Sequence, residues 1–147
     1  MYIINNFKSR KTMAYKVETI EGVGEVYVEK LNAVGIKTTD DILAKCATPK
    51  GRKELATETG ISEKLILKWA NHSDLMRING VAGQFAELLE ASGVDTVKEL
   101  QHRVPANLKA KMDEVNAVKN LVNRVPNLPE VEKMVEQAKA LEPVLTY

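Results

Sequence analysis

The stretch IEGVGEVYVEKLNAVGI, residues 20–36, contains the pattern that decides the fold. Its apolar residues in the second part recur at helical spacing, which predicts a short amphipathic helix. Gly22 and Gly24 precede this helix, and Gly35 follows it. A tight reversal needs backbone angles that residues with a Cβ avoid, which explains Gly22, and the left-handed end of a helix favours Gly35. The stretch therefore predicts a short helix near residues 16–20, a glycine turn and a second helix.

The same pattern returns 58 residues later as INGVAGQFAELLEASGV, starting at residue 78. Residues 20–45 align without a gap on residues 78–103, and eight of these 26 pairs are identical. Unrelated segments would share roughly one or two identities, so the chain contains an internal repeat. Beyond residue 103 the match loosens, although GISEK at 60–64 corresponds to NLPEV at 127–131.

Helix start signals recur through both copies. Thr38 and Asp41 have the spacing of a capping box, as do Thr96 and Glu99, in which a hydroxyl and a carboxylate satisfy free amides at a helix start. No segment alternates convincingly as a strand. We therefore expect an all-α fold, with two tandem units of about five short helices each, packed pseudo-symmetrically. Further helix starts are indicated at Thr48 before Pro49, at Ser62 before a helix over residues 63–71, and at Pro129.

The repeat also predicts how the chain is organised. The first unit is expected over residues 14–73 and the second over 74–142, followed by a short tail at 143–147. Residues 1–13 are expected to be a flexible arm, or the product of an upstream start codon, because Met13 would make a natural start for the folded part.

Composition narrows the class of protein. A chain of 147 residues that is 44% hydrophobic can form one domain or two small ones. No run approaches the ~20 apolar residues that cross a bilayer, and the N-terminus lacks the pattern of a secretory signal. A single cysteine, Cys46, and two separated histidines, His72 and His102, argue against a disulfide or a structural zinc site. We expect a cytoplasmic protein with no metal, cofactor or membrane partner.

The charges are evenly balanced, with 21 Lys and Arg against 20 Asp and Glu. Three of the basic residues lie in the N-terminal arm, so residues 16–147 hold 18 basic and 20 acidic side chains, a net charge of −2. Dedicated nucleic-acid-binding proteins usually carry a basic excess. Such a role would therefore rest on a local patch, and the densest basic cluster is formed by Lys45, Lys50, Arg52 and Lys53.

A glycine turn that leads into a helix exposes amides without intrahelical partners, where the helix dipole favours an anion such as phosphate. The pattern Ile20-x-Gly22-Val23-Gly24, continued to Gly35, resembles the helix-hairpin-helix motif, and the segment from Ile78 resembles a second copy. The wider pattern, through Thr38 and Gly60-Ile61-Ser62, is similar to the N-terminal helical domain of archaeal recombinases. The doubled arrangement resembles an uncharacterised bacterial family of paired helix-hairpin-helix units.

This resemblance implies sequence-independent binding of double-stranded DNA across the minor groove, with each hairpin gripping one strand. Glu21 and Glu25 flank the first turn and would repel phosphate, whereas Asn79 and Gln84 leave the second turn neutral. The second turn is therefore the better candidate, although the Ala82-Gly83 pair leaves open whether it is re-registered. The candidate nucleic-acid-binding set is Gly22, Val23, Gly24, Lys30, Lys50, Arg52, Lys53, Arg77, Gly80, Val81, Ala82, Gly83 and Gln84.

Several of these features also have a purely structural interpretation, in which Val23 folds inward between the helices and the glycine turns only pack two helices compactly. Trp69, Tyr27 and Phe85 are expected in the core, Cys46 as a small buried residue, and both histidines as surface caps near helix ends. No arrangement of nucleophile and base, phosphate-binding loop or carboxylate cluster predicts an enzyme. Two hypotheses remain: a non-enzymatic DNA-binding module, favoured by the paired hairpins, and a protein-interaction adaptor, favoured by the even charge.

Overall fold

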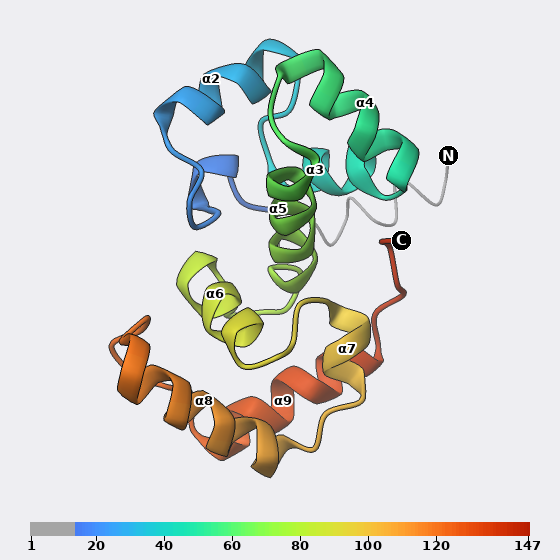
Figure 1. Ribbon diagram of the computed structural model, residues 1–147. Helices are drawn as coiled ribbons and strands as arrows, with labels where there is room; N and C mark the ends of the chain where they lie inside the picture. The colour runs from blue at the N-terminus through green and yellow to red at the C-terminus, as the bar shows by residue number, and fades with distance from the viewer. Residues whose placement is uncertain (1–13) are drawn as a thin grey trace.

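The computed structural model describes residues 14–147, and its regular elements in this range are helical (Figure 1). The elements are the 3-10 helix η2 (Val17–Thr19) and the α-helices α2 (Glu25–Ala33), α3 (Thr39–Cys46), α4 (Pro49–Thr59), α5 (Glu63–Leu75), α6 (Gly83–Ala91), α7 (Val97–Gln101), α8 (Pro105–Lys119) and α9 (Leu128–Lys139). An isolated antiparallel bridge joins Lys16 to Thr38. The all-α prediction is confirmed, and the arm expected at residues 1–13 lies outside the described residues.

Side-chain caps define where most helices begin. The Thr38 hydroxyl accepts from the Asp41 amide at 3.2 Å, and the Asp41 carboxylate accepts from the Thr38 amide at 3.0 Å, so the predicted capping box is present. Each cap of this kind contributes about 1 kcal/mol. Thr48, Ser62 and Thr96 also cap helix starts, as predicted, but at Thr96 only the hydroxyl half of the predicted capping box is present. Asn127 forms a full capping box with Glu130, and α9 begins at Leu128, one residue before Pro129.

Helix α5 forms the centre of the hydrophobic core. It packs against α3, α4 and α6, while α9 packs against α7 and α8 (Figure 1). Trp69 of α5 is buried, and its ring meets that of Tyr27 edge-on, with the centroids 5.1 Å apart. Val23 and Val81 are buried beneath their turns. The predicted core positions of Trp69 and Val23 are therefore confirmed, and Val81 is buried in the same way beneath the second turn.

The C-terminal end of α5 differs from the prediction. The helix continues four residues beyond its expected end at Asn71 and ends at Leu75, so the expected boundary between residues 73 and 74 falls inside it. His72 lies in this extension and is fully buried, so the prediction that it is a surface cap is wrong. The helix continues because the second glycine turn begins only at Ile78, and α5 leads almost directly into it.

The two halves of the chain, residues 14–75 and 76–147, meet at a close backbone contact. A Cβ added to Gly83, the first residue of α6, would lie 2.2 Å from the Thr19 carbonyl oxygen and 3.3 Å from the Glu21 amide nitrogen. Only a residue without a side chain allows such an approach. Gly83 therefore places the start of α6 directly beside the turn that leads into α2, as Figure 1 also shows.

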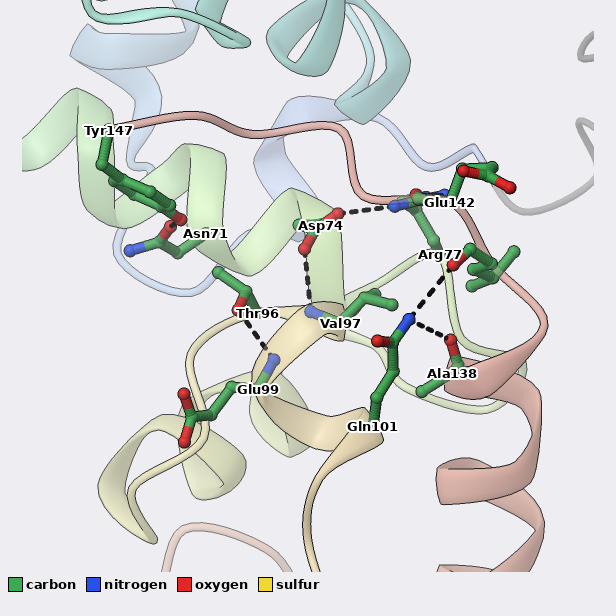
Figure 2. Close-up of polar contacts among 11 residues, drawn as sticks. Asn71, Asp74, Arg77, Thr96, Val97, Glu99, Gln101, Ala138, Glu142 and Tyr147 are labelled. Atoms are coloured by element: carbon green, nitrogen blue, oxygen red, sulfur yellow. Dashed lines mark hydrogen bonds and ion pairs between the residues drawn. The ribbon is translucent and has the colours of Figure 1, made fainter.

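A buried polar cluster joins α5, α7 and the C-terminal segment (Figure 2). The Asp74 carboxylate, in a residue that is 2% exposed, accepts from the Val97 amide and from Arg77 Nη1, both at 2.8 Å. Arg77 Nη2 in turn donates to the Glu142 carbonyl oxygen at 2.8 Å. Gln101 adds a further link, because its Nε2 donates to the carbonyl oxygen of Ala138. This cluster attaches both α7 and the end of the chain to α5.

Residues 146–147 return to the first half of the chain. The Thr146 amide donates to the Ala47 carbonyl oxygen at 2.8 Å, and the Tyr147 hydroxyl donates to Asn71 Oδ1 at 2.7 Å (Figure 2). Arg52 Nη2 donates to the Thr146 carbonyl oxygen at 2.8 Å, and its guanidinium lies 5.4 Å from the centre of the Tyr147 ring. The segment predicted as a short tail is therefore held against the first half by specific contacts.

The buried thiol of Cys46 provides a simple test of this packing. Burial raises the pKa of Cys46 to about 11, although Arg52 and Lys45 partly oppose the shift. Because the thiolate is the reactive form, we expect no reaction with a thiol reagent at neutral pH in the folded protein and complete reaction in denaturant. A colorimetric thiol titration measures both states. Rapid, stoichiometric labelling under native conditions would contradict the structure around α3.

Candidate nucleic-acid interface

The first glycine turn, residues 20–24, leads from η2 into α2. Gly22 has a φ of +92°, which residues with a Cβ rarely adopt, and the Val23 amide donates to the Ile20 carbonyl oxygen at 3.1 Å. Gly24 is the N-cap of α2 and provides no side-chain cap. The amides of Gly24, Glu25 and Val26 donate no hydrogen bond to another residue in the range 14–147. The start of α2 is therefore open toward a hydrogen-bond acceptor from outside.

The second glycine turn, residues 78–82, has the same backbone arrangement. Gly80 has a φ of +86°, and the Val81 amide donates to the Ile78 carbonyl oxygen at 3.1 Å. Ala82 is the N-cap of α6, in an extended conformation like that of Gly24. The turn therefore keeps the register of the first one, and alanine is tolerated because this position has a negative φ. The following Gly83 serves the contact between the halves instead.

The two glycine turns differ in charge and in exposure. Glu21 and Glu25 are exposed beside the first turn, where their carboxylates oppose the approach of an anion. Asn79, Gly80 and Gln84 are exposed around the second turn, whereas Ala82 is half-buried and Gly83 is buried against the first half. The accessible part of the second turn is therefore its tip and the Gln84 position.

Two of the predicted basic residues are already engaged by the protein. Arg52 is 6% exposed, and its guanidinium donates to the carbonyl oxygens of Cys46 and Thr146, so it does not extend the basic surface of Lys50 and Lys53. The Arg77 side chain is 11% exposed and is paired with Asp74. Both arginines hold segments of the fold together in this structure, because each joins backbone or carboxylate groups that are distant in sequence.

The exposed lysines of the predicted set lie in separate places. Lys30 is exposed on α2. Lys50 and Lys53 are exposed at the start of α4, which lies on the far side of the first half from both glycine turns (Figure 1). The structure therefore brings the two turns together but does not bring the α4 lysines to them.

Sequence reasoning missed the basic residues that the structure places beside the second turn. A groove of about 530 Å³ lies between this turn and α9, and we call it the α9 groove. The Asn79 amide donates to Gln137 Oε1, which ties the turn to α9. Lys133 and Gln137 are four residues apart and share a helix face, but no local pattern relates that face to a turn some fifty residues earlier. The lining includes Gly80, Phe85, Arg124, Lys133, Met134 and Gln137.

A second cluster of polar groups lies between α5 and α6. His72 Nε2 is 3.0 Å from Glu90 Oε1 and 4.0 Å from Glu87 Oε1, which is close enough to consider a metal ion. Lys68 Nζ lies 3.8 Å from Glu87 and 3.7 Å from Glu90, so a cation already lies beside both carboxylates and offsets part of their charge. A metal at Nε2 would move the proton to His72 Nδ1, which has no hydrogen-bond partner among the described residues. The geometry favours an ion-pair network that ties α5 to α6.

These elements define an all-helical protein in which two glycine turns lie side by side, each leading into a helix without a side-chain cap. The chain belongs to the family described as Domain of unknown function (DUF4332), whose model matches residues 21–141. This match confirms the expected membership of an uncharacterised domain family. Neither a curated protein nor a solved structure matches the chain. Among residues 14–147, no helix has the length and apolar character needed to span a membrane.

Proposed function

We propose that the protein is a non-enzymatic module that binds double-stranded DNA without sequence preference, mainly through its second glycine turn. The observation that carries this proposal is the combination of an exposed, acid-free turn tip at Asn79 and Gly80 with Lys133 on the adjoining face of α9. The Asn79 amide is engaged by Gln137, but the Gly80 amide donates to no other residue within 14–147, and a backbone amide of this kind positions a phosphate without reading sequence. A lysine beside it adds affinity through the release of counterions, so binding should depend steeply on salt.

The proposal includes the interpretation of the chain as two tandem helix-hairpin-helix units. Three features support it: the similar positive φ angles of Gly22 and Gly80, the buried valine under each turn, and the threonine N-caps at the repeat positions Thr38 and Thr96. In this interpretation α5 closes the first unit and also forms the first helix of the second hairpin. The first turn, with Glu21 and Glu25 beside it, has the smaller part in binding because its acids oppose phosphate.

The alternative function is that of a protein-interaction adaptor, in which both turns are only structural. The observation that favours it is the balance of 21 basic against 20 acidic residues, together with the exposed acids of the first turn. An adaptor would bind no duplex even at low salt and would co-purify with a defined protein partner. DNA binding that falls with salt, and that depends on the second turn, excludes this alternative.

The substitution Gln84→Glu tests the proposal without weakening the fold. A carboxylate in the first turn of α6 is favourable for the helix dipole, so we expect stability to stay the same or rise slightly. The same charge repels a phosphate at the second turn, so duplex affinity should fall about tenfold. Fluorescence anisotropy with a short duplex, measured between 50 mM and 200 mM salt, gives both the affinity and its salt slope.

The matched control is Asn107→Glu, which adds the same charge to the first turn of α8, another helix start without a side-chain cap. Asn107 is exposed, and the start of α8 lies well away from both glycine turns (Figure 1). We expect this variant to bind almost as the parent protein does. Equal losses of duplex affinity in the two variants would show that the effect comes only from the change in net charge. A parent protein that binds no duplex at low salt would refute the DNA proposal.

A further inference from the structure

The α9 groove is larger and more apolar than a site for a phosphate alone needs to be. Its volume of about 530 Å³ is within the ~300–1,000 Å³ that is usual for small-molecule sites. Phe85 and Met134 line it and are half-buried, packed against the hydrophobic core, and Pro126 adds a buried apolar surface. The groove therefore has an apolar lining with an aromatic ring, directly beside the turn that we propose as the phosphate contact.

The charged groups of the groove leave one cation available. Arg124 is bound to Glu130 through both carboxylate oxygens, each at 3.0 Å, and Glu130 also accepts from the Asn127 amide. Arg124 holds the pKa of Glu130 at about 2, so this pair stays charged and internally balanced at neutral pH. Lys133 also lines the groove and has no ion-pair partner within residues 14–147. An incoming anion would therefore be met by Lys133.

Two carboxamides add hydrogen-bonding capacity at the rim. Gln137 uses its Oε1 to accept from the Asn79 amide, which leaves its two N–H donors without a partner among the described residues. The Asn79 side chain is exposed and likewise makes no hydrogen bond to the described part of the chain. Carboxamides are suited to the edges of nucleobases, which present donors and acceptors in one plane.

We propose that the α9 groove binds one unpaired nucleotide of a DNA strand whose adjoining phosphates lie on the second glycine turn; this rests on the DNA-binding function proposed above. The base stacks on Phe85 and Met134, its edge meets Asn79 and Gln137, and Lys133 contacts a neighbouring phosphate. Aromatic stacking of a base tolerates any sequence. A base that is already unpaired avoids the cost of leaving the duplex, so DNA with an extrahelical nucleotide is the preferred substrate class.

The experiment compares three short duplexes of the same sequence: one fully paired, one with a single bulged nucleotide, and one with the same bulge lacking its base. The two bulged duplexes have the same phosphates and differ only in the base. We expect the duplex with the bulged nucleotide to be bound about tenfold more tightly than either of the other two duplexes. A bulged 2-aminopurine should also lose fluorescence on binding, because it stacks in the groove.

Three variants assign the preference to the groove. Phe85→Leu removes the aromatic ring with little change in volume and should abolish the preference for the bulged base, whereas Phe85→Tyr should retain it. Tyr27→Leu is the matched control, because Tyr27 is the repeat equivalent of Phe85 but does not line the groove. Circular dichroism checks that each variant is folded, and the 2-aminopurine signal of the parent protein tests the proposal even if Phe85→Leu does not fold.

The possible outcomes separate this inference from the proposed function. Equal affinity for the bulged and base-free duplexes, or a preference that survives in folded Phe85→Leu, overturns the nucleotide site. If the fully paired duplex is still bound in a salt-dependent way, the DNA-binding function stands while the nucleotide site falls. If none of the three duplexes is bound at low salt, both proposals fall.

Discussion

Replacement of Asp74 by alanine is expected to lower the free energy of unfolding by about 3–5 kcal/mol, the usual loss when one partner of a buried ion pair is removed. The change leaves Arg77, whose side chain is 11% exposed, without its carboxylate partner, and it leaves the Val97 amide at the start of α7 without an acceptor. Small domains are stable by only about 5–15 kcal/mol, so this loss would be a large part of the total. Urea unfolding followed by far-UV circular dichroism measures it.

The control for Asp74 is an ion pair with similar geometry on the surface. Asp113 accepts from Lys109 at 3.0 Å within α8, and its side chain is 52% exposed. Because solvent screens an exposed pair, Asp113→Ala should change stability by no more than about 0.5 kcal/mol. Similar effects at the two positions would show that burial does not strengthen the Asp74–Arg77 pair. The double variant Asp74→Leu/Arg77→Leu should be more stable than Asp74→Ala, because no buried charge remains unpaired.

Replacement of Gly83 by alanine should also destabilise the protein, by about 1–3 kcal/mol, as overpacking commonly does. The added methyl group would lie 2.2 Å from the Thr19 carbonyl oxygen. Both groups are attached directly to the backbone, so neither can move aside as the end of a flexible side chain could. The two halves would have to move apart at this contact. Alanine is the better helix former, so a loss of stability could not come from helix propensity. Chemical denaturation of the variant and the parent protein gives the difference.

Gly24→Ala is the matched comparison for Gly83→Ala. Gly24 has a negative φ, and no atom lies within 4 Å of a Cβ placed on it. Its repeat equivalent is already an alanine, Ala82, with nearly the same backbone conformation. We therefore expect Gly24→Ala to leave stability unchanged or to raise it slightly. Equal losses for the two glycine substitutions would contradict the close contact between the halves.

Local signals in the sequence predicted the helices well. The caps at Thr38, Thr48, Ser62 and Thr96 depend on residues three positions apart, and such spacing is visible in one dimension. The inward position of Val23 follows from the same short-range argument. The length of α5 was underestimated because the segment after Asn71 is rich in polar residues. These residues are buried by contacts with the second half, which no window along the first half contains.

The candidate interface could be predicted only in part, for the same physical reason. The two glycine turns were found from the repeat, and their backbone conformations agree with the prediction. Arg52 and Arg77 looked like surface bases, but their partners at Thr146 and Glu142 lie 94 and 65 residues away in the chain. Lys133 was overlooked because its position beside the second turn depends on the packing of α9. Charge counts along a chain therefore identify the basic residues but do not show which of them remain without a partner in the folded protein.

The attachment of residues 146–147 to the first half has a consequence for biosynthesis. A ribosome produces Arg52 and Asn71 long before it reaches Thr146 and Tyr147, so the nascent first half lacks the carbonyl oxygen and the hydroxyl that these side chains bind in the finished protein. Until then the Arg52 guanidinium must keep part of its hydration, which opposes its burial. The Arg52 and Asn71 side chains therefore gain their final partners only after all the helices have been translated. The first half of the chain cannot complete its native contacts before the second half has been synthesised.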